Sequence, residues 1–496
     1  MTEFDLTVIG GGINGVSIAA ESASRGLRTL LIHSNDLASS ASATPVTLAG
    51  THLEHLSALD YFQLNTMLEE LEALSNTASH LVDFMPIKTL NATPVKEKGQ
   101  NIVEQFFQGI KDKALANQSH FDINTKTQSL AARIKPARLI ISKAIQAKHY
   151  GASIRPYHCL REAERHQDHW RLSIENRVGS TPATPQITVK TKLLVNSGGW
   201  WANELLEKTL NVKTRCKASE EHRTQFYFRN PGVQLGSNQV IKIPGPTKNA
   251  FYVYPVNDTT FAFGPRKCDQ HGYAECVDLQ QLFMECWNNA ASSLAISTPL
   301  SAEHFVHKRK ERLALIADPC ANADTPITAP LLDLNNPGKT AILLNIFGAD
   351  AVLHRKVAQQ ALDVLLPFHG KKANSEFAHA TLPGGQAGTQ DKPSENQYLT
   401  ALQKRHPTLS SALLSRLSNH YGSLADTILV NCNTETDLGV NFGHHLYETE
   451  VRYLVDTEWA TNAHDILWRR TLLGLAFDKQ QTQNLQEWIE GEYGLA

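Results

Sequence analysis

The sequence predicts an α/β (α+β) chain: a Rossmann-like nucleotide-binding domain with an inserted antiparallel sheet, followed by an all-helical C-terminal domain. Three observations predict this architecture. A glycine-rich turn joins the first strand to a helix, short alternating strands fill the middle of the chain, and helical periodicity dominates its C-terminal part.

A complete βαβ unit opens the chain. An apolar strand over residues 5–9 runs into three glycines with GxGxxG spacing, and a small-residue helix over 16–25 and a second strand over 27–32 follow. In that context the glycines allow a tight turn, close approach of a pyrophosphate and close packing of helix on strand. The helix N-terminus also attracts an anion. The predicted cofactor-binding residues of this loop are Gly10, Gly11, Gly12, Asn14 and Gly15.

The residue after the second strand departs from the usual pattern of a dinucleotide site. An Asp or Glu commonly accepts hydrogen bonds from the ribose there, but this chain has His33, and the next acid is Asp36. A neutral imidazole accepts only one hydrogen bond. We therefore predict that His33 lies at the ribose of a cofactor and that the affinity for a dinucleotide is weakened.

The chain then alternates between helical and extended patterns. Helices are predicted over 56–81 and 137–150, and the polar, lysine-bearing segment 91–128 is interpreted as a surface excursion. Strands are predicted over 153–155, 170–174, 186–190 and 192–196. The last strand runs into Gly198 and Gly199, which suit close approach of a ligand.

The middle of the chain predicts an antiparallel sheet, with strands over 225–228, 240–243, 250–254 and 260–263. This sheet either forms the wall of a substrate pocket or is purely structural. A last buried strand over 341–346, Gly348 and a helix over 351–366 form a second strand–glycine–helix junction. We place the oxidoreductase region at 1–370, with nucleotide-binding parts at 1–85, 135–215 and 335–370 and the sheet at 216–334, and the helical domain at 371–496.

The composition excludes several functions. The formal net charge of −2 over 496 residues provides no field that would favour nucleic acid. The seven cysteines form no CxxC pair and the histidines no HExxH, so we expect reduced thiols and no metal site. No signal peptide precedes the first strand, and no apolar run is long enough to cross a membrane. We expect a cytoplasmic protein, with peripheral binding to the inner face of the cell membrane left open.

Several motifs resemble the FAD-dependent, quinone-linked glycerol-3-phosphate dehydrogenases. The N-terminal matches are residues 5–15, 35–38 and the Val-Asn-Ser-Gly-Gly-Trp-Trp element at 195–201; the C-terminal ones are 382–385, 420–422, 437–439, 453–455 and 465–471. The resemblance covers essentially the whole chain. It implies FAD as the cofactor, oxidation of sn-glycerol 3-phosphate to dihydroxyacetone phosphate, and transfer of electrons to membrane quinone; it leaves a homodimer open.

The chain departs from that family where cations contact the substrate. The family's phosphate-binding arginine falls on Glu54 without gaps, or on Thr51 with a three-residue gap, and Asp350 replaces a lysine. Arg312 is the one phosphate-site cation that the resemblance carries over, and we predict it as a catalytic residue. A carboxylate in place of a cation repels phosphate.

Three functional hypotheses therefore stay open: a glycerol-3-phosphate dehydrogenase, an FAD oxidoreductase for an uncharged or cationic substrate, or a non-catalytic binding or regulatory paralogue.

Overall fold

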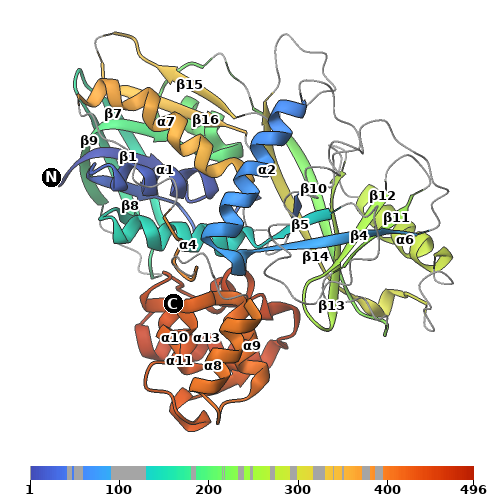
Figure 1. The fold of residues 1–496 in the computed structure, drawn as a ribbon. Helices are drawn as coiled ribbons and strands as arrows, with labels where there is room; N and C mark the ends of the chain where they lie inside the picture. The colour runs from blue at the N-terminus through green and yellow to red at the C-terminus, as the bar shows by residue number, and fades with distance from the viewer. Residues whose placement is uncertain are drawn as a thin grey trace.

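The structure is a computed structural model. It describes residues 2–41, 47–49, 60–90, 130–179, 186–214, 216, 218–232, 239–245, 250–268, 274–290, 299–316, 330–338, 340–348, 351–370, 380–385 and 395–495. Two sheets stand side by side, and helices of the C-terminal part form a separate cluster beside the first sheet (Figure 1). The predicted fold class is confirmed.

The first sheet is built on the predicted βαβ unit, β1 (Thr2–Ile9), α1 (Ile13–Ser24) and β2 (Thr29–Ile32). In the described part of the chain its strand order is β15-β16-β9-β1-β2-β6, and the four neighbouring pairs from β16 to β6 are parallel. The antiparallel β8 and β7 extend from β9. The other strands of this sheet are β6 (Ser153–Arg155), β7 (His158–Arg165), β8 (Trp170–Asn176), β9 (Gln186–Asn196), β15 (Leu331–Asn335) and β16 (Ile342–Phe347).

Helices cover one face of this sheet, and a meander with a short helical segment covers the other. The first layer is α1, α4 (Pro136–His149) and α7 (His354–His369), whose apolar side chains pack on Leu6, Val8 and Leu344. On the opposite face, side chains of β7, β8 and the helical turns over 199–209 pack around Phe4 and Leu343. Both faces are apolar, as expected of a parallel sheet.

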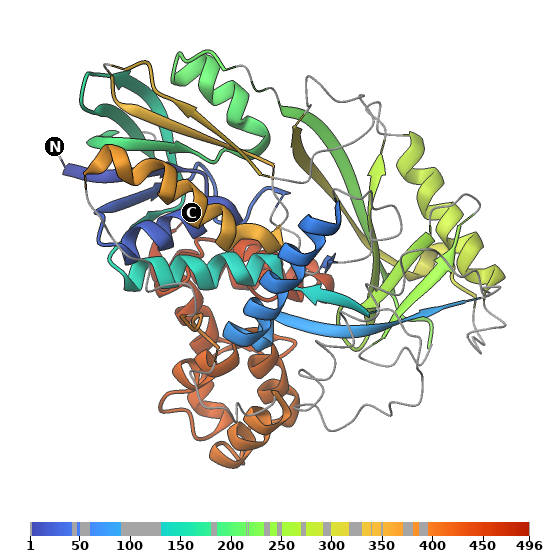
Figure 2. The same ribbon diagram turned by 45° about the horizontal axis from the view of Figure 1, so that its top comes forward.

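The second sheet has the order β14-β10-β13-β12-β11-β4-β5-β3 among the described residues. Every pair is antiparallel except β11 with β4. Its strands are β3 (Thr47–Ala49), β4 (Val82–Thr89), β5 (Leu130–Ile134), β10 (Ala218–Arg229), β11 (Val240–Pro244), β12 (Ala250–Pro255), β13 (Thr260–Cys268) and β14 (Phe305–Ile316). Helix α6 (Ala274–Asn289) covers one face through Phe283 and Trp287, which stack on phenylalanines of the strands. Figure 2 shows α2 (Asp60–Thr77) between the two sheets.

The C-terminal helical region, residues 395–495, has its own apolar core. Its elements are α8 (Glu395–Arg405), α9 (Ser411–Tyr421), α10 (Ala425–Ile428), β17 (Asn441–Gly443), β18 (Leu446–Tyr447), α11 (Glu448–Asp456), α12 (Ala463–Asp465) and α13 (Lys479–Tyr493).

Several predicted boundaries were wrong. The strands expected at 186–190 and 192–196 are one strand, because Thr191 pairs with Phe4 on one side and Trp170 on the other. The helix expected over 56–81 is described from Asp60, ends at Thr77, and is followed by a 3₁₀ turn over Ser79–Leu81 before β4. The helix expected over 351–366 begins as a 3₁₀ turn and ends at His369, where Gly370 caps it with a φ of +77°. Strands β3, β4, β5, β7, β14, β15, β17 and β18 were not predicted.

Candidate cofactor and substrate site

A cavity of about 570 Å³ opens at the carboxyl ends of β1, β9 and β16. Ligands of open α/β sheets commonly bind at this edge. The cavity is lined by residues 9–14 of the glycine loop, 32–35 after β2, 158–161 of β7, 197–199 and 201 after β9, and by Leu313, Ala314, Ile346 and Gly348.

The glycine loop is shaped for close packing. Gly10 has a φ of +122°, and a Cβ on it would lie 2.2 Å from the carbonyl oxygen of Ser197. A Cβ on Gly15 would lie 1.9 Å from the carbonyl oxygen of Gly10. The Asn14 side chain donates from Nδ2 to the Gly348 carbonyl at 3.1 Å, while its buried Oδ1 has no hydrogen-bond partner among the described residues. The Asn14 side-chain oxygen is therefore an acceptor that a ligand in the cavity could use.

His33 lies at the end of β2 and lines the cavity. Its Nε2 hydrogen-bonds to the Ser39 hydroxyl at 3.0 Å, and its ring lies against the glycine loop, 2.9 Å from where a Cβ on Gly11 would be. Burial, reinforced by Arg469 and opposed by Asp36, lowers the pKa of His33 to about 4. The imidazole is therefore neutral at pH 7.

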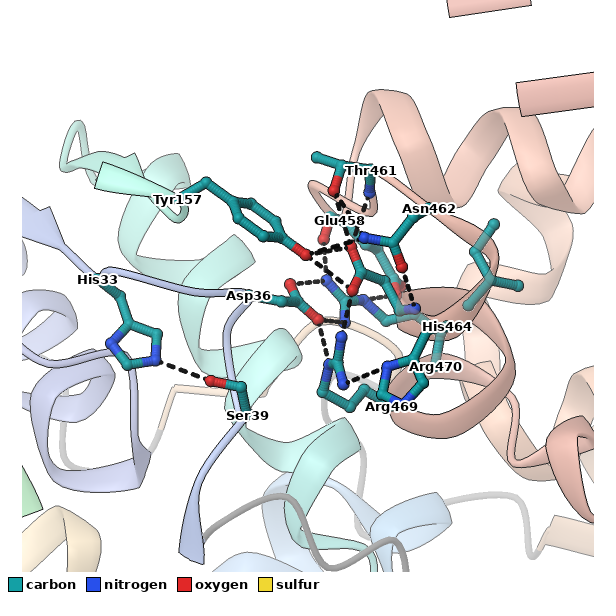
Figure 3. A network of polar contacts seen from close by, with 12 residues as sticks. His33, Asp36, Ser39, Tyr157, Glu458, Thr461, Asn462, His464, Arg469 and Arg470 are labelled. Atoms are coloured by element: carbon teal, nitrogen blue, oxygen red, sulfur yellow. Dashed lines mark hydrogen bonds and ion pairs between the residues drawn. The ribbon is translucent and has the colours of Figure 1, made fainter. Parts of the chain in front are cut away.

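A buried ion network lies beside this end of the cavity (Figure 3). The carboxylate of Asp36 accepts from both terminal nitrogens of Arg470 at 2.7 and 2.8 Å, and from Nε of Arg469. Arg469 also donates to Asp465, which accepts the hydroxyl of Tyr157 at 2.7 Å. Burial alone would raise the pKa of Asp36, but the two arginines lower it, so this carboxylate is ionised.

The network continues into the first sheet's helical layer. Arg138 of α4 makes two hydrogen bonds to Glu458, at 2.5 and 2.9 Å, and both side chains are almost fully buried. These contacts attach the C-terminal helical region to the nucleotide-binding part.

One face of the second sheet carries a polar row. Gln225 and Tyr227 of β10 pair in register with Arg309 and His307 of β14. The Tyr227 hydroxyl donates to Gln225 at 2.6 Å, and Gln225 donates to the Tyr254 hydroxyl. Further along β14, Leu313 and Ala314 line the cavity, and side-chain alternation puts Arg309 on the face of Leu313 and Arg312 on that of Ala314.

The two tyrosines of this row are protonated at neutral pH. Burial raises the pKa of both Tyr227 and Tyr254. Arg309 lies 3.8 Å from the Glu311 carboxylate, and its Nε has no hydrogen-bond partner among the described residues. The Arg309 guanidinium is therefore the group of this row that can still donate to an oxygen atom of a polar small molecule.

Comparison with known proteins decides the family. The family model described as FAD dependent oxidoreductase matches residues 5–295, and the model for the C-terminal domain of alpha-glycerophosphate oxidase matches residues 376–490.

The chain belongs to the FAD dependent oxidoreductase family.

Curated relatives agree over nearly the whole length. The aerobic glycerol-3-phosphate dehydrogenase of Escherichia coli (strain K12) is 24% identical, covering 98% of this chain and 97% of that protein. The glycerol-3-phosphate dehydrogenase of Pseudomonas aeruginosa is 27% identical over 99% and 96%, and the D-erythritol 1-phosphate dehydrogenase of Brucella abortus 24% over 98% and 97%. The resemblance to glycerol-3-phosphate dehydrogenases is confirmed.

A solved structure has the same fold. The glycerol-3-phosphate dehydrogenase from Bacillus halodurans, complexed with FAD, has a TM-score of 0.71 at 18% identity, covering 100% of this chain and 91% of that one.

The cavity of this FAD dependent oxidoreductase fits its cofactor. Gly11, Gly12 and Asn14 line the cavity at the start of α1, where a helix N-terminus attracts a pyrophosphate. The unpartnered Asn14 oxygen can accept from a hydroxyl, and neutral His33 can make one hydrogen bond to a ribose. These residues could hold FAD.

The structure brings most predicted site residues together. Gly10, Gly11, Gly12, Asn14, His33, Gly198, Gly199 and Gly348 line the cavity, and Gly15 packs behind the loop. Arg312 is not among them: it is exposed, and its guanidinium lies 4.8 Å from the ring centre of Trp200. Its predicted role as a catalytic residue stays untested. Thr51, Glu54 and Asp350 lie outside the described residues.

Sequence reasoning missed the inward polar row and the ion network. The period-2 alternation of Phe226-Tyr-Phe228 and of Lys308-Arg-Lys-Glu311 could have indicated the row. Nothing in the sequence pairs Asp36 with an arginine more than four hundred residues away. Within the described ranges there is no cluster of three His, Cys, Asp or Glu side chains suited to a metal ion, and no helix there is long and apolar enough to cross a bilayer.

Proposed function

We propose that this FAD dependent oxidoreductase oxidises a hydroxyl-bearing carbon of a small polyol phosphate, with glycerol 3-phosphate as the first substrate to test. The observation that carries the proposal is that β14, the strand that bears Arg309 and His307 of the polar row, also lines the cavity through Leu313 and Ala314. The names of relatives that cover nearly the whole chain support the substrate class. When bound, FAD accepts the hydride.

The side chains of the row supply what such a substrate needs. Arg309 offers a positive charge and a planar set of donors to a phosphate or hydroxyl oxygen. The buried hydroxyls of Tyr227 and Tyr254 stay protonated and hold the side chain of Gln225, which pairs in register with Arg309. Burial makes these interactions stronger than they would be in water.

A matched pair of arginines tests the proposal. Arg309→Gln removes the buried guanidinium, whereas Arg312→Gln removes an exposed one from the same strand. Loss of a charge-assisted hydrogen bond costs about 1.5–3 kcal/mol, so Arg309→Gln should lower kcat/KM roughly 10- to 150-fold in a dye-reduction assay. Arg312→Gln should leave it nearly unchanged. The opposite ranking would favour Arg312 as the catalytic residue. The proposal also requires that a polyol phosphate reduces the bound flavin of the wild-type protein under anaerobic conditions.

We expect glycerol 3-phosphate to be a slow substrate. The family's cations fall on Thr51 or Glu54 and on Asp350, and a carboxylate there disfavours both phosphate binding and a reduced, anionic flavin. Asp350→Lys combined with Thr51→Arg, or with Glu54→Arg in the ungapped alignment, should raise the turnover. Wild-type turnover in the ordinary range of about 1–1,000 per second would contradict this expectation.

A second candidate substrate is an uncharged polyol. The Glu311 carboxylate lies 3.8 Å from Arg309 and offsets part of its charge. Reduction of the bound flavin by the free polyol but not by its phosphate would favour this candidate, and a protein that binds FAD without reacting with either would be a binding or regulatory paralogue.

The electron acceptor and location are also proposals. We infer that electrons pass to a membrane quinone and that the protein docks peripherally on the inner face of the cell membrane, with a homodimer left open. We propose segment 87–115, with its lysines and Phe106-Phe107, as the docking segment. Lys88, exposed near the end of β4, belongs to its described part.

A further inference from the structure

The loops at the His33 end of the cavity are both anchored in the C-terminal helical region. Residues 33–35 and 158–161 line the cavity there. Asp36 follows the first segment directly, and Tyr157 precedes the second. Both side chains turn away from the cavity toward Arg469, Arg470 and Asp465 (Figure 3).

The hydrogen bonds of Asp36 hold its side chain in one position. Asp36 is 1% exposed and holds Arg470 through two hydrogen bonds and Arg469 through a third. Arg470 also donates to the Glu458 carbonyl at 2.6 Å. Bidentate arginine–carboxylate pairs fix orientation as well as distance, so the loop after β2 cannot shift without moving the 465–470 segment.

The backbone joins the two loops to each other and to the glycine loop. The N–H of Tyr157 donates to the Asn35 carbonyl at 3.0 Å, the N–H of His158 to His33 at 2.7 Å, and the N–H of Ala38 to Gly11 at 3.1 Å. A displacement at either anchor is therefore passed directly to the residues that line the cavity.

Two non-glycine residues in this assembly have left-handed backbones. Tyr157 has a φ of +55° and Ala38 a φ of +59°. Such conformations persist only where the surrounding structure holds them. Tyr157 is held by backbone hydrogen bonds with Asn35 and Arg177 and by its hydroxyl, which donates to Asp465 of α12 and accepts from Asn462. The conformation of the loop thus depends in part on the C-terminal helical region.

We propose that Asp36 and Tyr157 are positioning residues through which the C-terminal helical region sets the affinity for FAD. This inference rests on the FAD cavity but not on the substrate. Because coupling between two sites is reciprocal, bound FAD must in turn stabilise the packing of residues 457–471 against the nucleotide-binding part.

Tyr157→Phe is the decisive variant. It removes one hydroxyl and keeps the ring, whereas Asp36→Asn leaves two buried arginines short of a charge and endangers folding. The matched control is Tyr421→Phe, which deletes the same kind of hydrogen bond, from a tyrosine to the Glu450 carboxylate at 2.6 Å, and keeps the ring that packs on Arg138. Tyr421 does not line the cavity.

Two quantities are measured. The first is the Kd of the full-length apoprotein for FAD, obtained by titration with flavin fluorescence as the signal, and the second is the Tm of the apoprotein. We expect Tyr157→Phe to weaken FAD binding by roughly 5- to 150-fold, the usual range of coupling between sites, and Tyr421→Phe to lower the Tm without changing the Kd. Hydrogen exchange of residues 457–471 in the wild type should slow when FAD is added.

Three results would overturn the proposal. They are an unchanged Kd in Tyr157→Phe, an equal loss of affinity in Tyr421→Phe, or exchange of residues 457–471 that does not respond to FAD. A wild type that binds no FAD would overturn the cofactor site itself, and this inference with it. Loss of substrate turnover with normal FAD binding would bear on the proposed function alone.

Discussion

Replacing a helical glycine by alanine should have opposite effects on stability at Gly15 and at Gly491. Gly491 lies on an exposed face of α13, and a Cβ there would meet nothing within 4 Å. Alanine is favoured over glycine inside a helix by about 1 kcal/mol, so Gly491→Ala should stabilise the protein by about that amount. Gly15 in α1 gains the same propensity, but its Cβ would lie 1.9 Å from the Gly10 carbonyl oxygen, far inside the 3.4 Å of ordinary contact.

Because of this clash, Gly15→Ala should destabilise the protein. Relieving it requires the loop and α1 to separate by about 1.5 Å, and overpacking of this kind costs about 1–3 kcal/mol. The displaced atoms belong to the loop that lines the cavity, so we expect Gly15→Ala to weaken FAD binding at least tenfold, equivalent to about 1.4 kcal/mol.

Thermal unfolding of the apoproteins and fluorescence titration with FAD measure both effects. Gly491→Ala should raise the Tm and leave the Kd alone. A Gly15→Ala variant that gains stability like Gly491→Ala and binds FAD like the wild type would refute the reasoning, because the glycine would then serve helix geometry only.

Three further predictions concern His33, His420 and the 87–115 segment. His33→Glu should tighten FAD binding roughly tenfold, since an ionised carboxylate accepts from both ribose hydroxyls; His33→Gln is the uncharged control, and weaker binding by the glutamate variant would contradict this position for the ribose. Burial, helped by Lys135, lowers the pKa of His420 to about 3, so the unfolded chain binds more protons below pH 6.5. The contribution of this histidine to the free energy of unfolding is therefore complete above pH 6.5 and falls as the pH drops toward 3, by about 2 kcal/mol at pH 5. The fall in Tm between pH 7 and pH 5 should be smaller in His420→Gln than in the wild type. An equal fall in the two proteins would rule the effect out. Finally, the protein should float with anionic liposomes at low salt and be released at high salt, and protein left unbound at low salt would exclude docking through this segment.

Local patterns in the sequence determined much of the fold. The βαβ unit with its glycines, strands β10 to β13 of the second sheet and the C-terminal helices follow from periodicity and turn residues that lie within a few positions of one another. The motifs that resemble glycerol-3-phosphate dehydrogenases indicated the family, and the comparisons confirmed it. Element limits failed where tertiary pairing overrode the local signal, as at Thr191, which is held between two neighbouring strands.

Only the tertiary structure decided which charges meet. Asp36 was simply the next acid after His33, until folding placed it between Arg469 and Arg470. Arg309 and Arg312 are equivalent by composition, but the register of β14 turns one to the polar row and the other to Trp200 and solvent. The physical reason is that a buried charge is stabilised by partners brought together from distant parts of the chain. Those partners are chosen by strand register and helix packing, which the spacing of residues along one segment does not encode.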